Sequence, residues 1–249
     1  MVVSAHPLAS EVGINILKKG GNAADATIAV QFALAVVYPS AGNIGGGGFF
    51  VYRSKDGQCS TLDFREKAPL ASTRDMYLDS SNNVIKNLSL YSHLAVGVPG
   101  TVDGMVNIHK KYGQLPWKEL VQPAIDLATN GFELTRLEAN KLNRFNKTKG
   151  KINKNSEYYK EHFSEGDSIF LPQLSKTLIL IRDHKRAGFY SGETAEMLVK
   201  EMSLNGGKIT QQDLDSYQSI WRDPTICFYK GHKIISMSPP SSGGILLTQ

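Results

Sequence analysis

The stretch "LDFREKAP", from Leu62 to Pro69, contains an arginine that could bind a carboxylate. Arg65 follows a strand-like run and precedes Ala68-Pro69, so its backbone is expected to be held on a rigid element. A guanidinium group matches a planar carboxylate through two parallel hydrogen bonds. From the residues alone, a surface ion pair is the commoner role for such an arginine, so both interpretations stay open at this point.

Other residue types that often perform catalysis do not form a recognisable motif. Cys59 and Cys227 lack a C-x-x-C pattern, so that one disulfide and two free thiols are equally allowed. No G-x-S-x-G is present, and Ser241 and Ser242 in "PPSSGG" indicate a turn rather than a nucleophile. No H-E-x-x-H occurs, and the histidines are scattered at His6, His93, His109, His162, His184 and His232. The sequence therefore predicts neither a metal site nor a cofactor.

Four consecutive glycines, Gly45 to Gly48, could suggest a phosphate-binding loop, but the pattern does not fit one. A dinucleotide fingerprint would need a glycine where Phe50 stands, and a P-loop would need lysine where Phe49 stands. Phosphate loops also run from a strand into a helix, whereas here a helical pattern comes first and a strand pattern follows. The glycines therefore have another purpose.

The composition is that of a globular domain. In 249 residues, 41% are apolar and the net charge is +5, which gives no reason to expect a nucleic-acid partner. The Lys- and Asn-rich stretch from Arg136 to Lys160 is interpreted as a solvated helical excursion rather than a polyanion site. The most apolar segment, Ala26 to Val37, is far shorter than the about 20 residues that a membrane helix needs. No signal peptide is visible, and we expect a single domain over residues 1–249.

The first segments of the chain have clear helix and hairpin signals. In "HPLASEVGINILKKGG", residues 8, 12 and 16 lie on one face of an expected helix that starts near Pro7 and ends at Gly20. The next helix should begin after Asn22 as N-cap, be buried on every side and stop at Pro39. Two strand-like runs on either side of Asp56-Gly57 predict a β-hairpin.

The rest of the chain alternates similarly. Helical spacing returns in residues 101–113 and 116–131, each ending at a glycine, and a capping box is expected from Thr210 to Asp213. Two strand-like runs, "TICFY" and "HKIISM", come before "PPSSGG". Helices and hairpins in this alternation favour an α/β fold class built in layers.

Several of these stretches, taken in order, resemble the γ-glutamyltransferase (γ-glutamyl transpeptidase) family. The matching pieces are "SAHPLASEVGINILKKGGNAADATIAVQFALAVVYP", "GNIGGGGF", "LDFREKAP", "AVGVPGTVDG", "YGQLPW", "PAIDLATNGF", "GFYSGETAEMLV", "GGKITQQDLDSY" and "PPSSGGILLTQ". The resemblance implies an N-terminal-nucleophile hydrolase fold, an αββα sandwich of two β-sheets between helical layers, here incomplete because the small subunit is absent. In such a fold the glycine run would be the bend between a buried helix and a central strand.

The resemblance also implies a chemistry. Family members are made as one precursor that cuts itself into a large and a small subunit, and the new N-terminal threonine of the small subunit attacks the γ-glutamyl carbonyl of glutathione or a related compound. Arg65 matches the family arginine that grips the α-carboxylate of the γ-glutamyl group. The neighbouring Glu66 is a weaker candidate that would meet the α-amino group or support Arg65.

This chain departs from the family pattern in lacking any Thr-Thr-His, the motif in which the nucleophile lies. The resemblance therefore predicts a large-subunit portion that is inactive alone, with the small subunit of the same precursor as its partner. Like most of the family, it is expected outside the cytoplasm, whether periplasmic, secreted or at the outer cell surface. Two alternatives are a non-catalytic homologue that binds a ligand or protein partner, and a related acylase such as a cephalosporin acylase.

Overall fold

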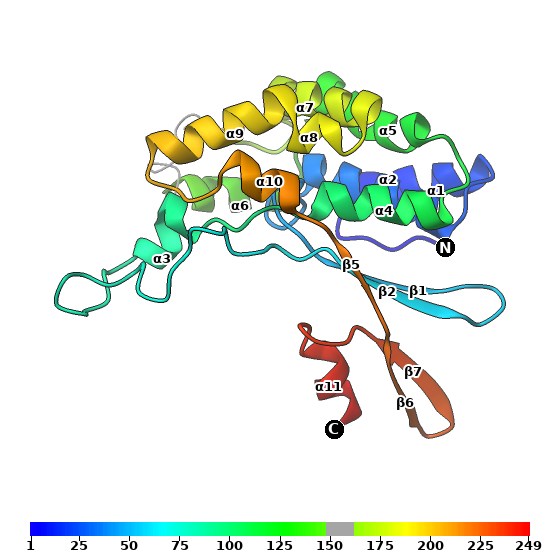
Figure 1. The fold of residues 1–249 in the computed structure, drawn as a ribbon. Coiled ribbons are helices and arrows are strands. Elements are labelled where there is room, and N and C mark those ends of the chain that lie inside the picture. The colour runs from blue at the N-terminus through cyan, green and yellow to red at the C-terminus, as the bar shows by residue number, and fades with distance from the viewer. Residues whose placement is uncertain (148–161) are drawn as a thin grey trace.

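The computed structural model describes residues 1–147 and 162–249, with a layer of helices above a small sheet and a hairpin projecting below it (Figure 1). The longer helices are α1 (Pro7–Lys18), α2 (Ala23–Val37), α4 (Thr101–Tyr112), α5 (Trp117–Asn130), α6 (Arg136–Phe145), α7 (Pro172–His184) and α9 (Gly192–Leu204). The shorter ones are α3 (Leu88–Tyr91), a 3-10 turn at His93–Ala95, α8 (Ala187–Tyr190), α10 (Gln211–Ser216) and α11 (Gly243–Thr248). The strands are β1 (Phe49–Arg53), β2 (Cys59–Asp63), β3 (Phe132–Glu133), β4 (Ser168–Ile169), β5 (Ile220–Arg222), β6 (Thr225–Tyr229) and β7 (His232–Ser236). This mixture of helices and strands agrees with the predicted α/β class.

Helix α2 lies inside the hydrophobic core, as the sequence predicted. Asn22 caps its first turn, and Asp25 completes the capping box by accepting the amide hydrogen of Asn22 at 3.0 Å. The buried Asp25 carboxylate also accepts the amide of Gln114, which ties α2 to the loop before α5. Further along α2, the ring of Phe32 meets Trp117 of α5 edge to face at 5.7 Å. Most residues of α2 are buried, so this helix lies at the centre of the helical layer.

Helix α1 begins and ends where expected, but its buried stripe is different. Ala9, Gly13 and Ile16 are buried, whereas Leu8 and Val12 pack only partly against the core. The reason is the close crossing with α2: a Cβ atom on Gly13 would lie 2.7 Å from a methyl carbon of Val30. Small residues therefore face the neighbouring helix. Of the predicted stripe, Ile16 is buried, whereas Leu8 and Val12 lie at its margin.

Strands β1, β2 and β5 form an antiparallel sheet in the order β1-β2-β5. The hairpin between β1 and β2 turns at Asp56-Gly57, as predicted, with Gly57 at a φ of +86°. In the described parts of the chain, β1 is at the edge of this sheet. In these residues β2 is the strand with neighbours on both sides. The expectation that the glycine run leads into a central strand concerns the complete fold and stays a prediction.

Helices cover only one face of this sheet. Phe50, Leu62 and Trp221 are cross-strand neighbours that point into the core. The alternate positions Val51 and Ile220 point to the other face, where they are 45% and 41% exposed. In the described residues, the sheet therefore has one side covered by helices and a second side, called the open face here, that exposes Val51 and Ile220 on its outer strands. Thr61 and Asp63 of the middle strand also lie on the open face but are buried.

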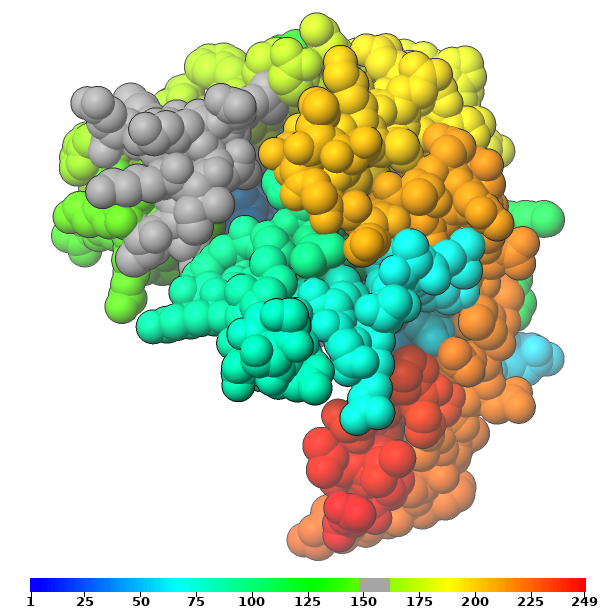
Figure 2. Space-filling model, turned by 60° about the vertical axis from the view of Figure 1, so that its left-hand side comes forward, coloured from blue at the N-terminus to red at the C-terminus, as the bar shows by residue number. Residues whose placement is uncertain are grey.

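The last part of the chain projects away from this body (Figure 1). β6 and β7 form a separate hairpin, and α11 packs against it. Figure 2 shows the hairpin and α11 extending below the rest of the molecule. The predicted turn at "PPSSGG" is present at residues 238–241, but the glycine pair Gly243-Gly244 opens α11, which the sequence analysis did not predict.

The Lys- and Asn-rich segment falls partly outside the described residues. Its first part forms α6, as a helical excursion requires, with Ala139 and Leu142 on the buried side. The prediction for residues 148–161 lies outside the described part of the chain.

The glycine run allows the backbone to pass very close to the end of β2. Gly48 and Phe64 exchange backbone hydrogen bonds of 3.3 and 3.1 Å, which continue the β1–β2 pairing. A Cβ atom on Gly47 would lie 2.5 Å from the carbonyl oxygen of Phe64 and 2.8 Å from the Cα atom of Arg65. At Gly45, by contrast, a Cβ atom would meet nothing within 4 Å. The need for glycine is therefore specific to its position in the run.

We predict that Gly47→Ala lowers the free energy of unfolding by about 1–3 kcal/mol, because the added methyl group would collide with backbone atoms that have no room to move. Gly45→Ala is the matched control and should be neutral within about 0.5 kcal/mol. Urea unfolding of both variants measures the difference. Equal stability of the two would contradict the close approach at Gly47.

Candidate functional site

Arg65 lies just beyond the end of β2 with its side chain exposed. Asp63, the last residue of the strand, turns the chain by accepting the amide hydrogen of Arg65 at 3.1 Å. The other carboxylate oxygen of Asp63 pairs with Arg222 of β5 at 2.9 Å, which fixes the aspartate in place. Phe64 between them is buried. The chain therefore leaves the core at Phe64 and exposes Arg65 from a well-anchored point.

Across residues 1–147 and 162–249, the Arg65 guanidinium has no hydrogen-bond or ion-pair partner. The Glu66 carboxylate likewise has none, although it too is exposed. Within the described part of the chain, Arg65 thus forms neither the surface ion pair that the bare sequence left open nor a salt bridge with Glu66. Arg65 is a cation held at the surface and available to an anion.

The segment that follows Arg65 is attached to two other parts of the chain. Lys67 and Val98 exchange backbone hydrogen bonds of 3.2 and 2.7 Å. The hydroxyl of Tyr217 donates to the backbone carbonyl of Arg65 at 2.8 Å, and the amide of Leu70 donates to Asp213 at 2.7 Å. Both Asp213 and Tyr217 belong to α10 and its C-terminal cap. The sequence analysis predicted the capping box at Asp213 but not these two contacts.

A buried carboxylate, Asp103 of α4, organises the surroundings of α10. It accepts hydrogen bonds from Arg186 at 2.8 Å, from the Ser219 hydroxyl at 2.7 Å and from the Asn107 amide at 3.0 Å. The Arg186 guanidinium continues to the backbone carbonyl of Tyr217 at 2.7 Å. A buried charge needs such partners, and here its partner cation also binds the end of α10.

Tyr217 remains a hydrogen-bond donor at neutral pH. Its burial raises the pKa of the hydroxyl, and the nearby carboxylate of Asp103 raises that pKa further. The ring stacks on that of Tyr190 with 5.9 Å between the ring centres, and the ammonium of Lys67 lies 5.1 Å from its centre. Nothing local in the sequence marks this tyrosine, because its contact with Arg65 joins residues 152 positions apart.

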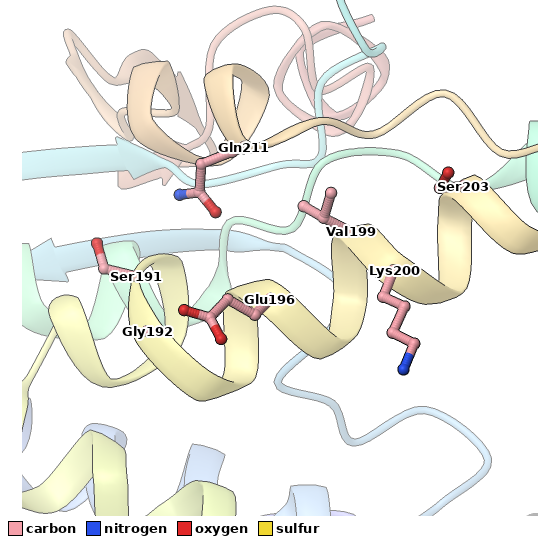
Figure 3. A pocket seen from close by; sticks show the side chains of 7 residues that line it. All are labelled: Ser191, Gly192, Glu196, Val199, Lys200, Ser203 and Gln211. Carbon is pink, nitrogen blue, oxygen red and sulfur yellow. The ribbon is translucent and has the colours of Figure 1, made fainter.

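A hollow of about 640 Å³ lies between α9 and α10 (Figure 3). It is lined by Ser191, Gly192, Glu196, Val199, Lys200, Ser203 and Gln211. A second hollow of about 330 Å³ adjoins it around α8 and the start of α9. Neither contains Arg65 or Glu66, so both candidate residues are exposed on the surface outside these hollows.

Two sequence questions outside this region have answers in the described part of the chain. Cys59 and Cys227 are free thiols, which resolves the two options that the sequence left open. No three metal-binding side chains among the described residues are grouped to hold an ion. The described helices are also too short or too polar to span a bilayer.

Comparison with known proteins identifies the family. Residues 9–249 match the model of the gamma-glutamyltranspeptidase family. The chain is 47% identical to the glutathione hydrolase proenzyme of Pseudomonas sp. (strain A14), with the match covering all of this chain and 44% of that protein. This chain therefore belongs to the gamma-glutamyltranspeptidase family, as its sequence motifs indicated, and spans less than half the length of that relative.

Solved structures agree with this assignment. The crystal structure of Helicobacter pylori gamma-glutamyltranspeptidase superposes with a TM-score of 0.96 at 48% identity, covering 99% of this chain and 72% of the other. The enzyme from Pseudomonas nitroreducens, solved with L-DON, gives 0.92 at 42% identity, covering 99% and 73%. The fold described above is therefore the fold of this part of those proteins.

We predict that Asp213→Asn destabilises the protein by about 1–2 kcal/mol at pH 7, because the Asp213 carboxylate accepts hydrogen bonds from both Thr210 and Leu70. Burial raises the pKa of this carboxyl group, but the hydrogen bonds outweigh it and place the pKa below its ordinary value of 3.8. The stabilisation is therefore complete above about pH 5 and is lost as the pH falls through the lowered pKa.

Urea unfolding of the wild type and Asp213→Asn between pH 7 and pH 2 checks this prediction. The stability gap should be constant down to about pH 5 and narrow below about pH 4. Asp215→Asn, on the exposed side of the same helix, is the control and should change little. A gap that is absent at pH 7, or that widens on acidification, would contradict the role given to Asp213.

Proposed function

We propose that this chain is the larger part of an enzyme that transfers or hydrolyses the γ-glutamyl group of glutathione and related compounds. The observation that carries the proposal is Arg65, an exposed guanidinium without an internal partner in the described residues, held at the end of a buried strand. Family membership supports it, as does the name glutathione hydrolase proenzyme of the Pseudomonas relative.

In this proposal, Arg65 binds the α-carboxylate of the γ-glutamyl group. Two parallel hydrogen bonds from one guanidinium fix both the position and the orientation of a carboxylate. The exposed Glu66 lies next in the chain and offers a carboxylate to the substrate's α-ammonium group. Opposite charges on adjacent residues match the paired charges of an amino acid, so these two residues would orient the substrate while another group attacks it.

The nucleophile is proposed to be the N-terminal threonine of a small subunit cut from the same precursor. A free α-amine has a pKa near 8, so it can take the proton of its own threonine hydroxyl. The hydroxyl oxygen then attacks the γ-glutamyl carbonyl, and the leaving amine departs with a proton. Water or an acceptor amine resolves the acyl-enzyme and restores the threonine.

The open face of the β1-β2-β5 sheet supports a partner at this position. Val51 and Ile220 are exposed there, while the other face of the sheet is covered by helices. We propose that a second sheet, contributed largely by the small subunit, covers this face and completes the αββα sandwich. An apolar sheet face is normally covered in a folded domain.

The two alternative functions, a non-catalytic homologue and a related acylase, differ from the proposed one in their dependence on Arg65 and on the threonine. A non-catalytic homologue would keep the fold and Arg65 but lack a functional threonine on its partner segment. A related acylase would act on substrates without an α-carboxylate and would not depend on Arg65. Substrate preference and dependence on Arg65 therefore distinguish the three.

We predict that residues 1–249 purified alone have no measurable glutathione hydrolase activity, because the chain contains no Thr-Thr-His nucleophile motif. The full-length precursor should process itself into two chains and hydrolyse glutathione. Mass spectrometry and an assay for released glutamate measure both. Activity of the 249-residue chain alone would refute the assignment of the nucleophile, and an unprocessed, inactive precursor would favour the non-catalytic homologue.

We predict that Arg65→Lys in the processed enzyme lowers kcat/KM for a γ-glutamyl anilide about 10- to 100-fold, since lysine lacks the two-pronged geometry that binds a carboxylate. Activity towards an analogue without the α-carboxylate should be unchanged by the substitution. Arg74→Lys is the control, because Arg74 is a fully exposed arginine nearby in the chain. Equal effects on both substrates would argue against carboxylate binding by Arg65.

A further inference from the structure

We propose that α10 and its C-terminal cap act as a clamp on residues 65–70 and that Tyr217 is a positioning residue for Arg65. This inference rests on the proposed role of Arg65 in substrate binding. The clamp is defined as residues 210–218, which the sequence analysis singled out only for a capping box and for part of the family resemblance. Its contacts with the arginine segment give it a role beyond capping its own helix.

The clamp holds the segment at both ends and in the middle. At the first end, the Tyr217 hydroxyl donates to the carbonyl of Arg65 at 2.8 Å. In the middle, the Lys67 ammonium donates to the carbonyl of Gln218 at 2.9 Å. At the other end, the amide of Leu70 donates to Asp213 at 2.7 Å. Three contacts over six residues restrict the whole segment.

The clamp is itself fixed to the body of the protein. One nitrogen of the Arg186 guanidinium donates to the carbonyls of Leu214, at 3.1 Å, and Tyr217, at 2.7 Å. Its other side is bound by Asp103 of α4, which is 3% exposed. The last carbonyl groups of a helix lack partners within the helix, so a guanidinium there can donate hydrogen bonds to them. Its positive charge also interacts favourably with the negative end of the helix dipole. The position of the clamp is thus set by an ion pair whose carboxylate is buried.

The Tyr217 hydroxyl packs closely against the backbone at Gly100. A Cβ atom on Gly100 would lie 2.0 Å from the hydroxyl oxygen and 2.1 Å from the carbonyl oxygen of Phe64. Glycine at this place lets the phenol reach the backbone beside Arg65. The buried tyrosine therefore lies between the start of α4 and the arginine segment, and a side chain at position 100 would displace its hydroxyl.

These contacts matter for Arg65 because its own side chain has no partner in the described residues. Its direction is set by the backbone that carries it, and the hydroxyl of Tyr217 fixes the peptide unit directly after it. Substrate positioning is sensitive to shifts of about 1 Å. Loss of the hydroxyl should loosen that peptide unit and weaken binding of the carboxylate without touching the chemistry.

The test is Tyr217→Phe in the full-length, processed protein, because phenylalanine keeps the ring and its stacking and removes only the hydroxyl. We expect KM for a γ-glutamyl anilide to rise about three- to tenfold, with kcat changed less than about twofold. The variant should turn over an analogue without the α-carboxylate with the same kcat/KM as the wild type. Hydrogen exchange at the amides of Arg65, Lys67 and Leu70 should accelerate in the same variant.

Tyr77→Phe is the matched control, since it also removes a tyrosine hydroxyl that donates to a backbone carbonyl, that of Leu94 at 3.1 Å. It should leave KM and exchange in residues 65–70 unchanged. Equal effects of the two variants, or normal KM and exchange in Tyr217→Phe, would overturn the clamp.

Arg65→Lys, measured beside these variants, separates this inference from the proposed function. A defect in Arg65→Lys without one in Tyr217→Phe would leave the function standing and refute the clamp. Normal KM in Arg65→Lys would refute the substrate-binding role of Arg65, and the positioning role of Tyr217 with it. Faster hydrogen exchange at the amides of residues 65–70 in Tyr217→Phe would then show only that Tyr217 stabilises this segment.

Discussion

The ion pair between Asp103 and Arg186 is the interaction on which the candidate site depends. Asp103 is buried near the start of α4, and it pairs with Arg186, the residue just before the first turn of α8. Through the same guanidinium, the pair holds the end of α10, and through Ser219 it holds the chain entering β5. Three segments far apart in sequence, at Asp103, at Arg186 and at residues 214–219, therefore meet at one ion pair. The surface arginine is two contacts away from that pair, through Tyr217.

Much of the local structure could be predicted because its causes are local. The N-cap residue Asn22 predicts the start of α2, and Asp56-Gly57 predicts the hairpin. The capping box of Thr210 and Asp213 predicts α10. The errors arose where a neighbouring element decides the outcome. The buried side of α1 follows Gly13, whose lack of a side chain lets α2 approach, and no periodicity of large apolar residues reveals that.

The candidate site was predictable only in part, for a related reason. Arg65 was selected by its place in a family motif, and the structure adds that it has no ion-pair partner in the described residues. Its support was not predictable from local pattern. Tyr217 ends a stretch that matches the family, but nothing in that stretch indicates its contact with the arginine, for which Gly100 leaves room. At Gly13 and Gly100 the absence of a side chain permits close packing, and no local sequence pattern indicates it.

The open face of the β1-β2-β5 sheet has a consequence for how the protein is made. Exposed strand residues such as Val51, and hairpin residues such as Phe228 at 74% exposure, invite association with any suitable chain nearby. A covering segment on the same polypeptide, as proposed, would be present at an effective concentration in the millimolar range, on the order expected for a flexible connection. Synthesis as one precursor would thus secure the correct neighbour before an incorrect one could diffuse in, and cutting the chain afterwards would not separate surfaces already buried.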